Sequence, residues 1–132
     1  MPSHSTDISV FARSAELPGL LKTIADRAIE LGITDHDAIR LRLIVEELFA
    51  NTVIHGHRGD SNHVVTLSLH RTDSVSTLHY QDDAPAFNLL KISQKPVSSF
   101  DIGGQGIKLI RGMSKALRHE RRGRVNFTEV DF

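Results

Sequence analysis

The sequence predicts an α+β fold, a two-layer α/β sandwich with helices on one face of a mixed, mostly antiparallel sheet. Two observations predict it. Segments of alternating polar and apolar residues follow one another as hairpins, at residues 64–82 and 117–132. Segments with helical spacing of apolar residues precede and separate them, at residues 14–31, 34–56 and 103–117. Hairpins with inserted helices favour a sheet that is covered on one face.

The first part of the chain predicts one strand and two helices. Residues 7–13 alternate in polarity and predict a strand. Ser14 is placed to cap a helix that ends at Gly32. A capping-box-like pair at Thr34 opens a longer helix, which Gly56 ends.

The second part predicts two hairpins separated by a loop and a helix. Strands at residues 64–71 and 75–82 form the first hairpin. Residues 83–102 contain two prolines and no sustained period, so they predict a loop of about twenty residues, a length typical of functional lids. A glycine-rich turn at residues 103–106 then leads into a helix, and residues 117–132 form the closing hairpin with its turn at RRGR.

Length and composition indicate a single domain over residues 1–132, with a flexible tail at residues 1–6. Lys+Arg and Asp+Glu both number 16, so no global charge attracts nucleic acid or an anionic membrane. The absence of cysteine excludes disulfides and thiolate metal sites. No signal peptide or long apolar run is present, which favours a soluble cytoplasmic protein.

Three polar residues fall four apart in the long helix: Glu47, Asn51 and His55. Each four-residue step advances about 40° around an α-helix, so the three form one slightly slanted polar stripe. Glu46 lies about 140° from Asn51 and cannot share the role of Glu47. A carboxylate, a carboxamide and an imidazole on one line suit a hydrated divalent metal and the removal of a proton. The alternative is an amphipathic helix whose polar face is merely solvated.

Four other clusters are weaker indications. The turn GGQG before a helix suits a phosphate chain, although it lacks the Walker pattern. Asp82 ends a strand and can accept a hydrogen bond from an exocyclic amine such as that of adenine, or simply form a turn. His55, His57 and His63 match a zinc site poorly, because their spacing is irregular and cysteine is absent. Residues 108–124 carry seven Lys or Arg against one acid and no aromatic residue, which indicates a solvated face or an acidic protein partner.

Three motifs then occur in one order: ELFANTVIHG at residues 47–56, DDAPAFN at 82–88 and GGQGIKLI at 103–110. In that order and at these separations they resemble the N, G1 and G2 boxes of the GHKL ATPase superfamily, whose ATP-binding fold is the Bergerat fold. The compact size, the short lid and the GGxGIxLIR run are similar to the anti-sigma-factor serine protein kinases of bacterial partner-switching systems. The resemblance extends from about residue 8 to residue 130.

The resemblance implies roles for seven residues and implies ATP and Mg²⁺ as cofactors. It makes Glu47 the catalytic general base, Asn51 the magnesium ligand, His55 a polar group near the phosphates, Asp82 the reader of the adenine amine, Gly104 and Gly106 the glycines of the lid hinge and phosphate turn, and, more weakly, Thr128 a neighbour of adenine. Two positions depart from the pattern. Ala84 replaces a glycine and is expected to crowd adenine, and Lys115–Ala116 replaces an acidic pair that follows the third motif.

Proteins of this branch phosphorylate a serine on a STAS-domain antagonist, many bind a sigma factor, and they are commonly homodimers, so the resemblance implies these properties here. Two alternatives stay open. The catalytic domain of a sensor histidine kinase would need a helical hairpin with a phosphoacceptor histidine, for which we expect no room in this chain. A non-catalytic, nucleotide-dependent protein-binding regulator is compatible with the motifs, and Ala84 favours it.

Overall fold

The computed structural model describes residues 7–85 and 109–132. Outside these residues lie the expected tail at residues 1–6, most of the expected loop at 83–102, and Gly104 and Gly106.

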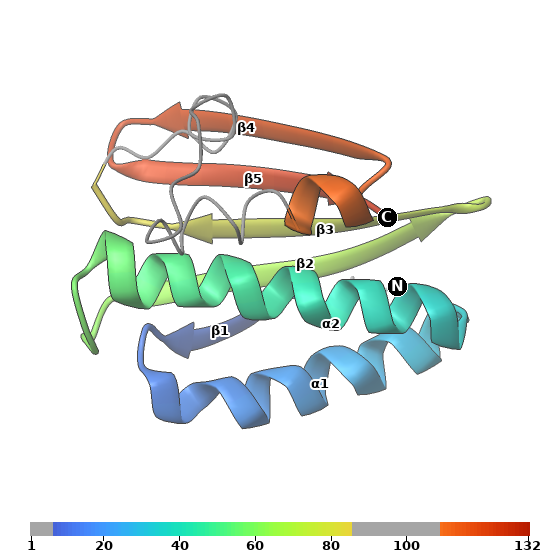
Figure 1. Cartoon of the computed structure of the whole chain (residues 1–132), viewed down its shortest axis with the longest axis horizontal. Coiled ribbons are helices and arrows are strands. Elements are labelled where there is room, and N and C mark those ends of the chain that lie inside the picture. The colour runs from blue at the N-terminus through green and yellow to red at the C-terminus, as the bar shows by residue number, and fades with distance from the viewer. Residues whose placement is uncertain (1–6, 86–108) are drawn as a thin grey trace, which may run out of the picture.

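Five strands form one sheet in the spatial order β1-β2-β3-β5-β4 (Figure 1). The strands are β1 (Ile8–Phe11), β2 (Val64–Thr72), β3 (Val75–Asp82), β4 (Ala116–Arg122) and β5 (Val125–Asp131). Every pairing among these described strands is antiparallel. The two hairpins expected from alternation are confirmed, with a left-handed residue at each turn: Asp73 at φ 55° and Gly123 at φ 61°.

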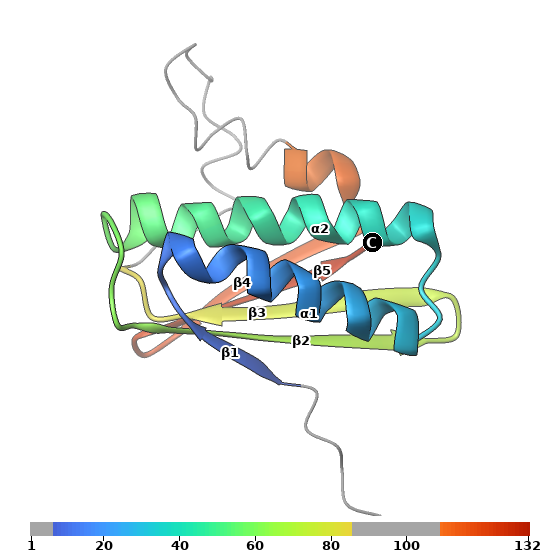
Figure 2. The same ribbon diagram turned by 90° about the horizontal axis from the view of Figure 1, so that it is seen from below.

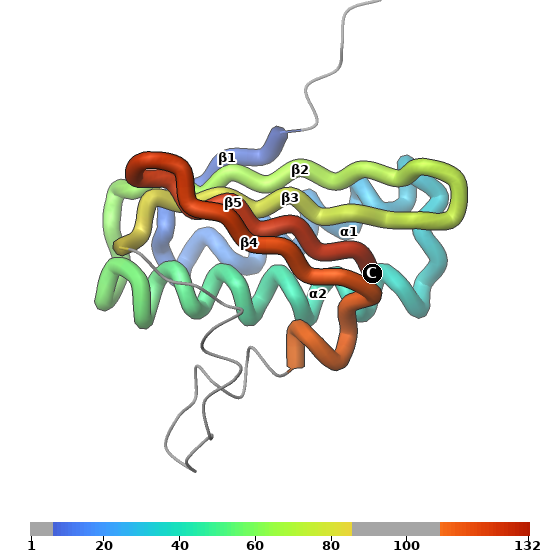
Figure 3. Tube along the Cα trace, turned by 90° about the horizontal axis from the view of Figure 1, so that it is seen from above, coloured from blue at the N-terminus to red at the C-terminus, as the bar shows by residue number. Residues whose placement is uncertain are grey.

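Two helices cover one face of this sheet (Figures 2 and 3). A short 3₁₀ turn, η1 (Ser14–Glu16), leads into α1 (Leu17–Glu30), and α2 (Asp35–Ala50) follows. The hydroxyl of Thr34 accepts a hydrogen bond from the Asp37 N–H at 3.2 Å, which caps α2. The expected α+β two-layer sandwich is therefore confirmed. Within the described ranges, no helix combines the length and apolar character that crossing a membrane requires.

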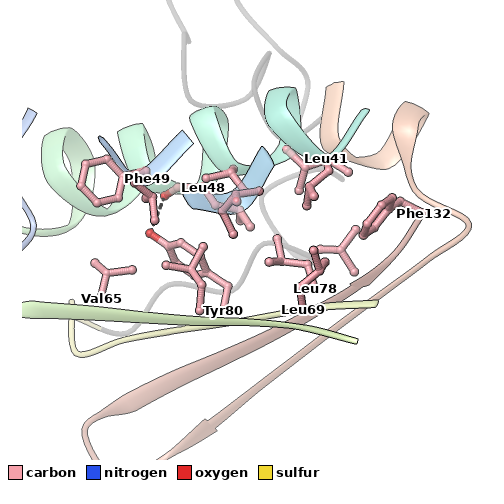
Figure 4. Close-up of a cluster of buried hydrophobic side chains, with 14 of the residues drawn as sticks. Leu41, Leu48, Phe49, Val65, Leu69, Leu78, Tyr80 and Phe132 are labelled. Carbon is pink, nitrogen blue, oxygen red and sulfur yellow. Dashed lines mark hydrogen bonds between the residues drawn. The ribbon is translucent and has the colours of Figure 1, made fainter. Parts of the chain in front are cut away.

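The core lies between the sheet and the helices (Figure 4). Along β2 and β3 the inward residues are buried and most outward residues are more exposed, as the period of two predicts. Figure 4 labels the buried side chains from α2, the sheet and the C-terminus: Leu41, Leu48, Phe49, Val65, Leu69, Leu78, Tyr80 and Phe132. Among the described residues, helices cover one face of the sheet.

The long helix does not stay α-helical to Gly56. It continues from α2 as a π-helix, η2 (Asn51–Gly56), and the N–H of His57 donates to the carbonyl of Thr52 at 2.9 Å. Bonds between residues five apart widen the turn, so the α-helical angle of about 100° per residue does not apply beyond Asn51. The slightly slanted polar stripe expected across residues 47–55 does not share one environment, because Asn51 is buried and His55 is exposed.

The helix expected to reach residue 117 ends sooner. Residues 109–113 are helical, and β4 already begins at Ala116. The Lys115 N–H donates to the carbonyl of Asp131 at 2.6 Å, so pairing with β5 captures the chain directly after the helix. The expected helix end was wrong because this tertiary pairing overrides local periodicity.

Candidate functional site

A small cavity of about 20 Å³ lies between the end of the α2–η2 helix and the sheet. Ten residues line it: Leu48, Asn51, Thr52, Gly56, Tyr80, Asp82, Ala84, His119, Asn126 and Thr128. Three of the residues singled out from the sequence, Asn51, Asp82 and Thr128, therefore meet at one place, although they come from a helix and two strands. All three are buried.

A chain of hydroxyl groups holds Asp82 from the helix side. The Thr52 hydroxyl donates to Asp82 Oδ2 at 2.6 Å, and it also lies 2.6 Å from the Tyr80 hydroxyl. The carbonyl of Leu48 is a further acceptor for both hydroxyls, at 3.1 Å from Thr52 and 3.2 Å from Tyr80. Burial raises the pKa of Tyr80 well above its usual value and keeps this donor protonated. Figure 4 shows the Tyr80 hydroxyl pointing from the sheet towards α2.

Asn126 holds the other oxygen of Asp82. Its Nδ2 donates to Asp82 Oδ1 at 2.8 Å and to the carbonyl of Ala84 at 3.0 Å. Arg121 in turn donates to Asn126 Oδ1 at 2.9 Å and to the same Ala84 carbonyl at 3.0 Å. The amide N–H of Asn126 is the same kind of donor as an exocyclic amine. Asn126 therefore already occupies part of the hydrogen-bonding capacity of the Asp82 carboxylate.

Sequence reasoning did not single out Thr52, Tyr80 or Asn126. Alternation along β3 and β5 places Tyr80 and Asn126 on the helix-facing side of the sheet. This alternation is the sequence pattern from which their position near the site could have been predicted. The register that sets Asp82 opposite Asn126 joins strands 44 residues apart, and no local pattern encodes it.

Asn51 carries a buried side-chain nitrogen that lacks a hydrogen-bond partner. The residue is 7% exposed, and its Nδ2 atom makes no hydrogen bond. An unpaired buried polar group costs free energy, and native proteins keep few of them. A side-chain amide kept unpaired in a cavity is available to a ligand, whichever way its nitrogen and oxygen are oriented.

The two adjacent glutamates are both half-buried, and neither lines the cavity. Glu47 is half-buried one turn before Asn51 on α2. Glu46 instead accepts from Arg42 Nε at 3.0 Å in an i,i+4 pair. His55 is exposed on η2 and does not line the cavity.

The chain matches a protein family described as "Histidine kinase-like ATPase domain" over residues 10–131. The chain belongs to this family. A comparison with curated proteins gives no match. Membership makes the protein a GHKL-type, ATP-binding, kinase-like ATPase domain, and the match runs from within β1 to the end of β5. This family match does not distinguish the anti-sigma-factor branch from other branches of the family.

The histidine kinase-like ATPase domain accommodates Ala84 by means of Gly56. A Cβ placed on Gly56 would lie only 2.6 Å from the Cβ of Ala84. Ala84 is buried at 3% exposure, so its methyl group uses the space that the bare Gly56 backbone leaves. The departure from the family glycine therefore adds bulk directly to the wall of the cavity.

The polar groups that line the cavity are of the chemical types that bind ATP and Mg²⁺. Asp82 offers a carboxylate, Thr128 a hydroxyl, and Asn51 an amide without a partner. The ten lining residues enclose about 20 Å³, which is room for one water, whereas ligand pockets measure roughly 300–1,000 Å³. The space enclosed by these residues is therefore smaller than a nucleotide needs.

Proposed function

We propose that this protein is an ATP-dependent serine protein kinase and anti-sigma factor of a partner-switching system. Its substrate would be a serine of a STAS-domain antagonist, and its second partner a sigma factor. The proposal places it in the cytoplasm and as a homodimer. The observation that carries the catalytic part is the unpartnered amide of Asn51, which shares a cavity with Asp82 one turn after Glu47. The branch assignment rests on the motif resemblance.

In this proposal Asp82, Asn51 and Glu47 each have a different role. Asp82 would accept a hydrogen bond from the adenine amine, and Asn51 would supply an oxygen ligand to Mg²⁺. Bound Mg²⁺–ATP supplies the phosphoryl group. Glu47 accepts the proton of the incoming serine hydroxyl, whose oxygen forms the new bond to phosphorus as ADP departs.

A matched pair of variants tests the role of Glu47. Glu47→Gln removes the base and keeps the size of the side chain, so we expect ATP affinity near the parent value. Transfer of radiolabelled phosphate to a STAS protein is expected to fall by roughly 10²–10⁴. Glu46→Gln is the control, because its carboxylate pairs with Arg42. Equal loss of transfer in the two variants would contradict the catalytic role.

A non-catalytic regulator that binds a protein partner in a nucleotide-dependent way is the second candidate. The observations that favour it are the cavity of about 20 Å³ and the methyl group of Ala84 on its wall. A parent protein that binds ATP and a STAS protein but transfers no phosphate would make this candidate the better account.

A further inference from the structure

Three side chains with metal-binding atoms lie close together outside the cavity, where β2 begins and β3 ends. His57 caps the end of η2, His63 directly precedes β2, and Asp83 directly follows β3. One ligand atom from each lies within 4.8 Å of the others. We propose that these residues form a binding site for a divalent transition-metal cation, for which Zn²⁺ is the natural probe.

The three ligand atoms lie within 4.8 Å of one another, and two of their separations are close to those around such a cation. His57 Nε2 lies 3.3 Å from Asp83 Oδ1, and His63 Nδ1 forms a 2.8 Å hydrogen bond with Asp83 Oδ2 that a cation would replace. Zinc bonds to nitrogen and oxygen are about 2.0–2.2 Å long, so ligand atoms in a tetrahedral site are separated by about 3.3 Å. Asp83 is 41% exposed, so it can shift by the few tenths of an ångström that the shorter distance requires.

A second, independent observation is the state of His57. Its side chain is only 7% exposed, and Nε2 makes no hydrogen bond, because the approach to Asp83 lacks the required geometry. A neutral imidazole nitrogen without a partner is a ligand atom that costs free energy until it binds something. A cation between Nε2 and Asp83 would satisfy both groups.

Binding of one cation by both histidines requires one ring to turn, because the lone pairs lie in the ring planes and these planes are nearly parallel. The rings of His57 and His63 are stacked, with centroids 4.2 Å apart and planes 12° from parallel. His63 is 52% exposed, so it has room to turn. Two imidazolium ions in this arrangement would repel each other. Two neutral imidazoles and one carboxylate carry a single negative charge and leave a fourth position for water, a set typical of zinc rather than of Mg²⁺.

The backbone holds this loop in place before any cation binds. Arg58 and Gly59 take left-handed conformations, at φ 58° and 136°, and reverse the chain after His57. The return is anchored to the end of β1, where Ala12 donates to the carbonyl of His63 at 2.8 Å and accepts from the N–H of Ser61 at 3.0 Å. Two ligands are thus oriented by backbone contacts, which lowers the entropic cost of binding.

The position of the site suggests what a cation would do. Asp83 follows Asp82, and His57 follows the helix that carries Asn51, so a cation would link the two walls of the cavity. Resting on the proposed function, we expect bound Zn²⁺ to change ATP affinity. The binding site itself does not depend on that function.

Zinc titration in the absence of nucleotide and Mg²⁺ tests the site. The chelator-treated full chain, without a histidine tag, competes for Zn²⁺ with a colorimetric chelator, and one equivalent is expected to bind. His63→Ala and Asp83→Asn alter exposed ligands and are each expected to weaken binding by at least about tenfold. His36→Ala is the matched control, because this exposed imidazole lies 3.7 Å from Asp37 outside the cluster.

Thermal unfolding supplies a second readout. Zn²⁺ is expected to raise the Tm of the parent protein and of His36→Ala, but not that of Asp83→Asn. The proposal is overturned if the parent binds no Zn²⁺, or if either ligand variant keeps the parent affinity. The titration contains no nucleotide, so its failure would leave the kinase proposal standing, and a failed phosphotransfer assay would leave the metal site standing.

Discussion

The two ends of the layer between α2 and the sheet are buried to a similar degree but differ in chemistry. One end consists of Leu41, Leu69, Leu78 and Phe132, each no more than 2% exposed. The other end consists of Thr52, Tyr80, Asp82 and Asn126, which are 3–9% exposed and polar. Burial of apolar area stabilises the first end by about 1.5–3 kcal/mol per large side chain, whereas hydrogen bonds contribute only about 1 kcal/mol each at the second.

The polar end contains a group that does not contribute to stability. At the polar end almost every group is satisfied by protein partners, and Asn51 is not. A protein selected only for stability would fill that position with an apolar side chain, since burying an unpaired amide has a cost. The cavity end of the layer therefore retains a buried polar nitrogen that no described residue satisfies.

Truncating the apolar end gives the largest expected effect on stability. Phe132→Ala removes a fully buried ring at the C-terminus and is expected to lower the free energy of unfolding by about 3–5 kcal/mol. Urea denaturation measures it. Ile39→Ala, at a site that is 62% exposed, is the control and is expected to change stability by less than about 0.5 kcal/mol. Equal losses would break the distinction between the buried core and the exposed surface.

A smaller effect is expected from filling the polar end. Gly56→Ala would bring a methyl group to 2.6 Å from the Cβ of Ala84, and such overpacking costs about 1–3 kcal/mol. The double variant Gly56→Ala with Ala84→Gly moves the methyl group across the contact and is expected to recover most of that loss. Denaturation of the two single variants and the double variant gives the coupling energy. Additive effects would show that the two residues do not share this space.

The smallest effect is expected on the open face of the sheet, where polar contacts meet water. Arg118 donates to Asp131 at 2.8 Å and 3.1 Å, and this contact, followed by the bond from Thr77, holds the pKa of Asp131 below its ordinary value of 3.8. Arg118 is 49% exposed, so solvent screens the pair, and Arg118→Ala is expected to cost about 0.2–1 kcal/mol at neutral pH.

The pH dependence follows from the direction of that shift. The pKa of Asp131 is lower in the folded protein than in the unfolded chain, so this carboxylate stabilises the fold at pH values above its ordinary pKa. The stabilisation is lost as the pH falls through the pKa of the folded protein. The stability difference between Arg118→Ala and the parent is therefore expected to shrink in urea denaturation as the pH falls from about 7 to about 3. A difference that stays constant would exclude the ion pair as its source.

Local patterns were sufficient for the hairpins and for the separation of the two glutamates. Alternation located β2 and β3 within one residue, because one face of the sheet is buried. The angle between Glu46 and Asn51 follows from α-helical geometry, which holds as far as Ala50. These features depend on neighbours a few residues away.

The rest of the site depends on contacts between distant segments. Asn126 meets Asp82 through strand register, and His57 meets Asp83 through a reversal at two left-handed residues. The π-helical end of α2, which exposes His55, has no periodic signal of its own. Ala84 was expected to crowd adenine, and its contact with Gly56 became visible only once the helix end and the strand end were placed together.

The central claim is that the buried amide of Asn51 is reserved for Mg²⁺–ATP, and calorimetric titration of Asn51→Ala with Mg²⁺–ATP tests it most directly. The side-chain nitrogen makes no hydrogen bond in the protein, so the variant is expected to unfold at close to the parent urea concentration while its ATP affinity falls at least about tenfold. A variant that binds Mg²⁺–ATP as tightly as the parent would contradict the account.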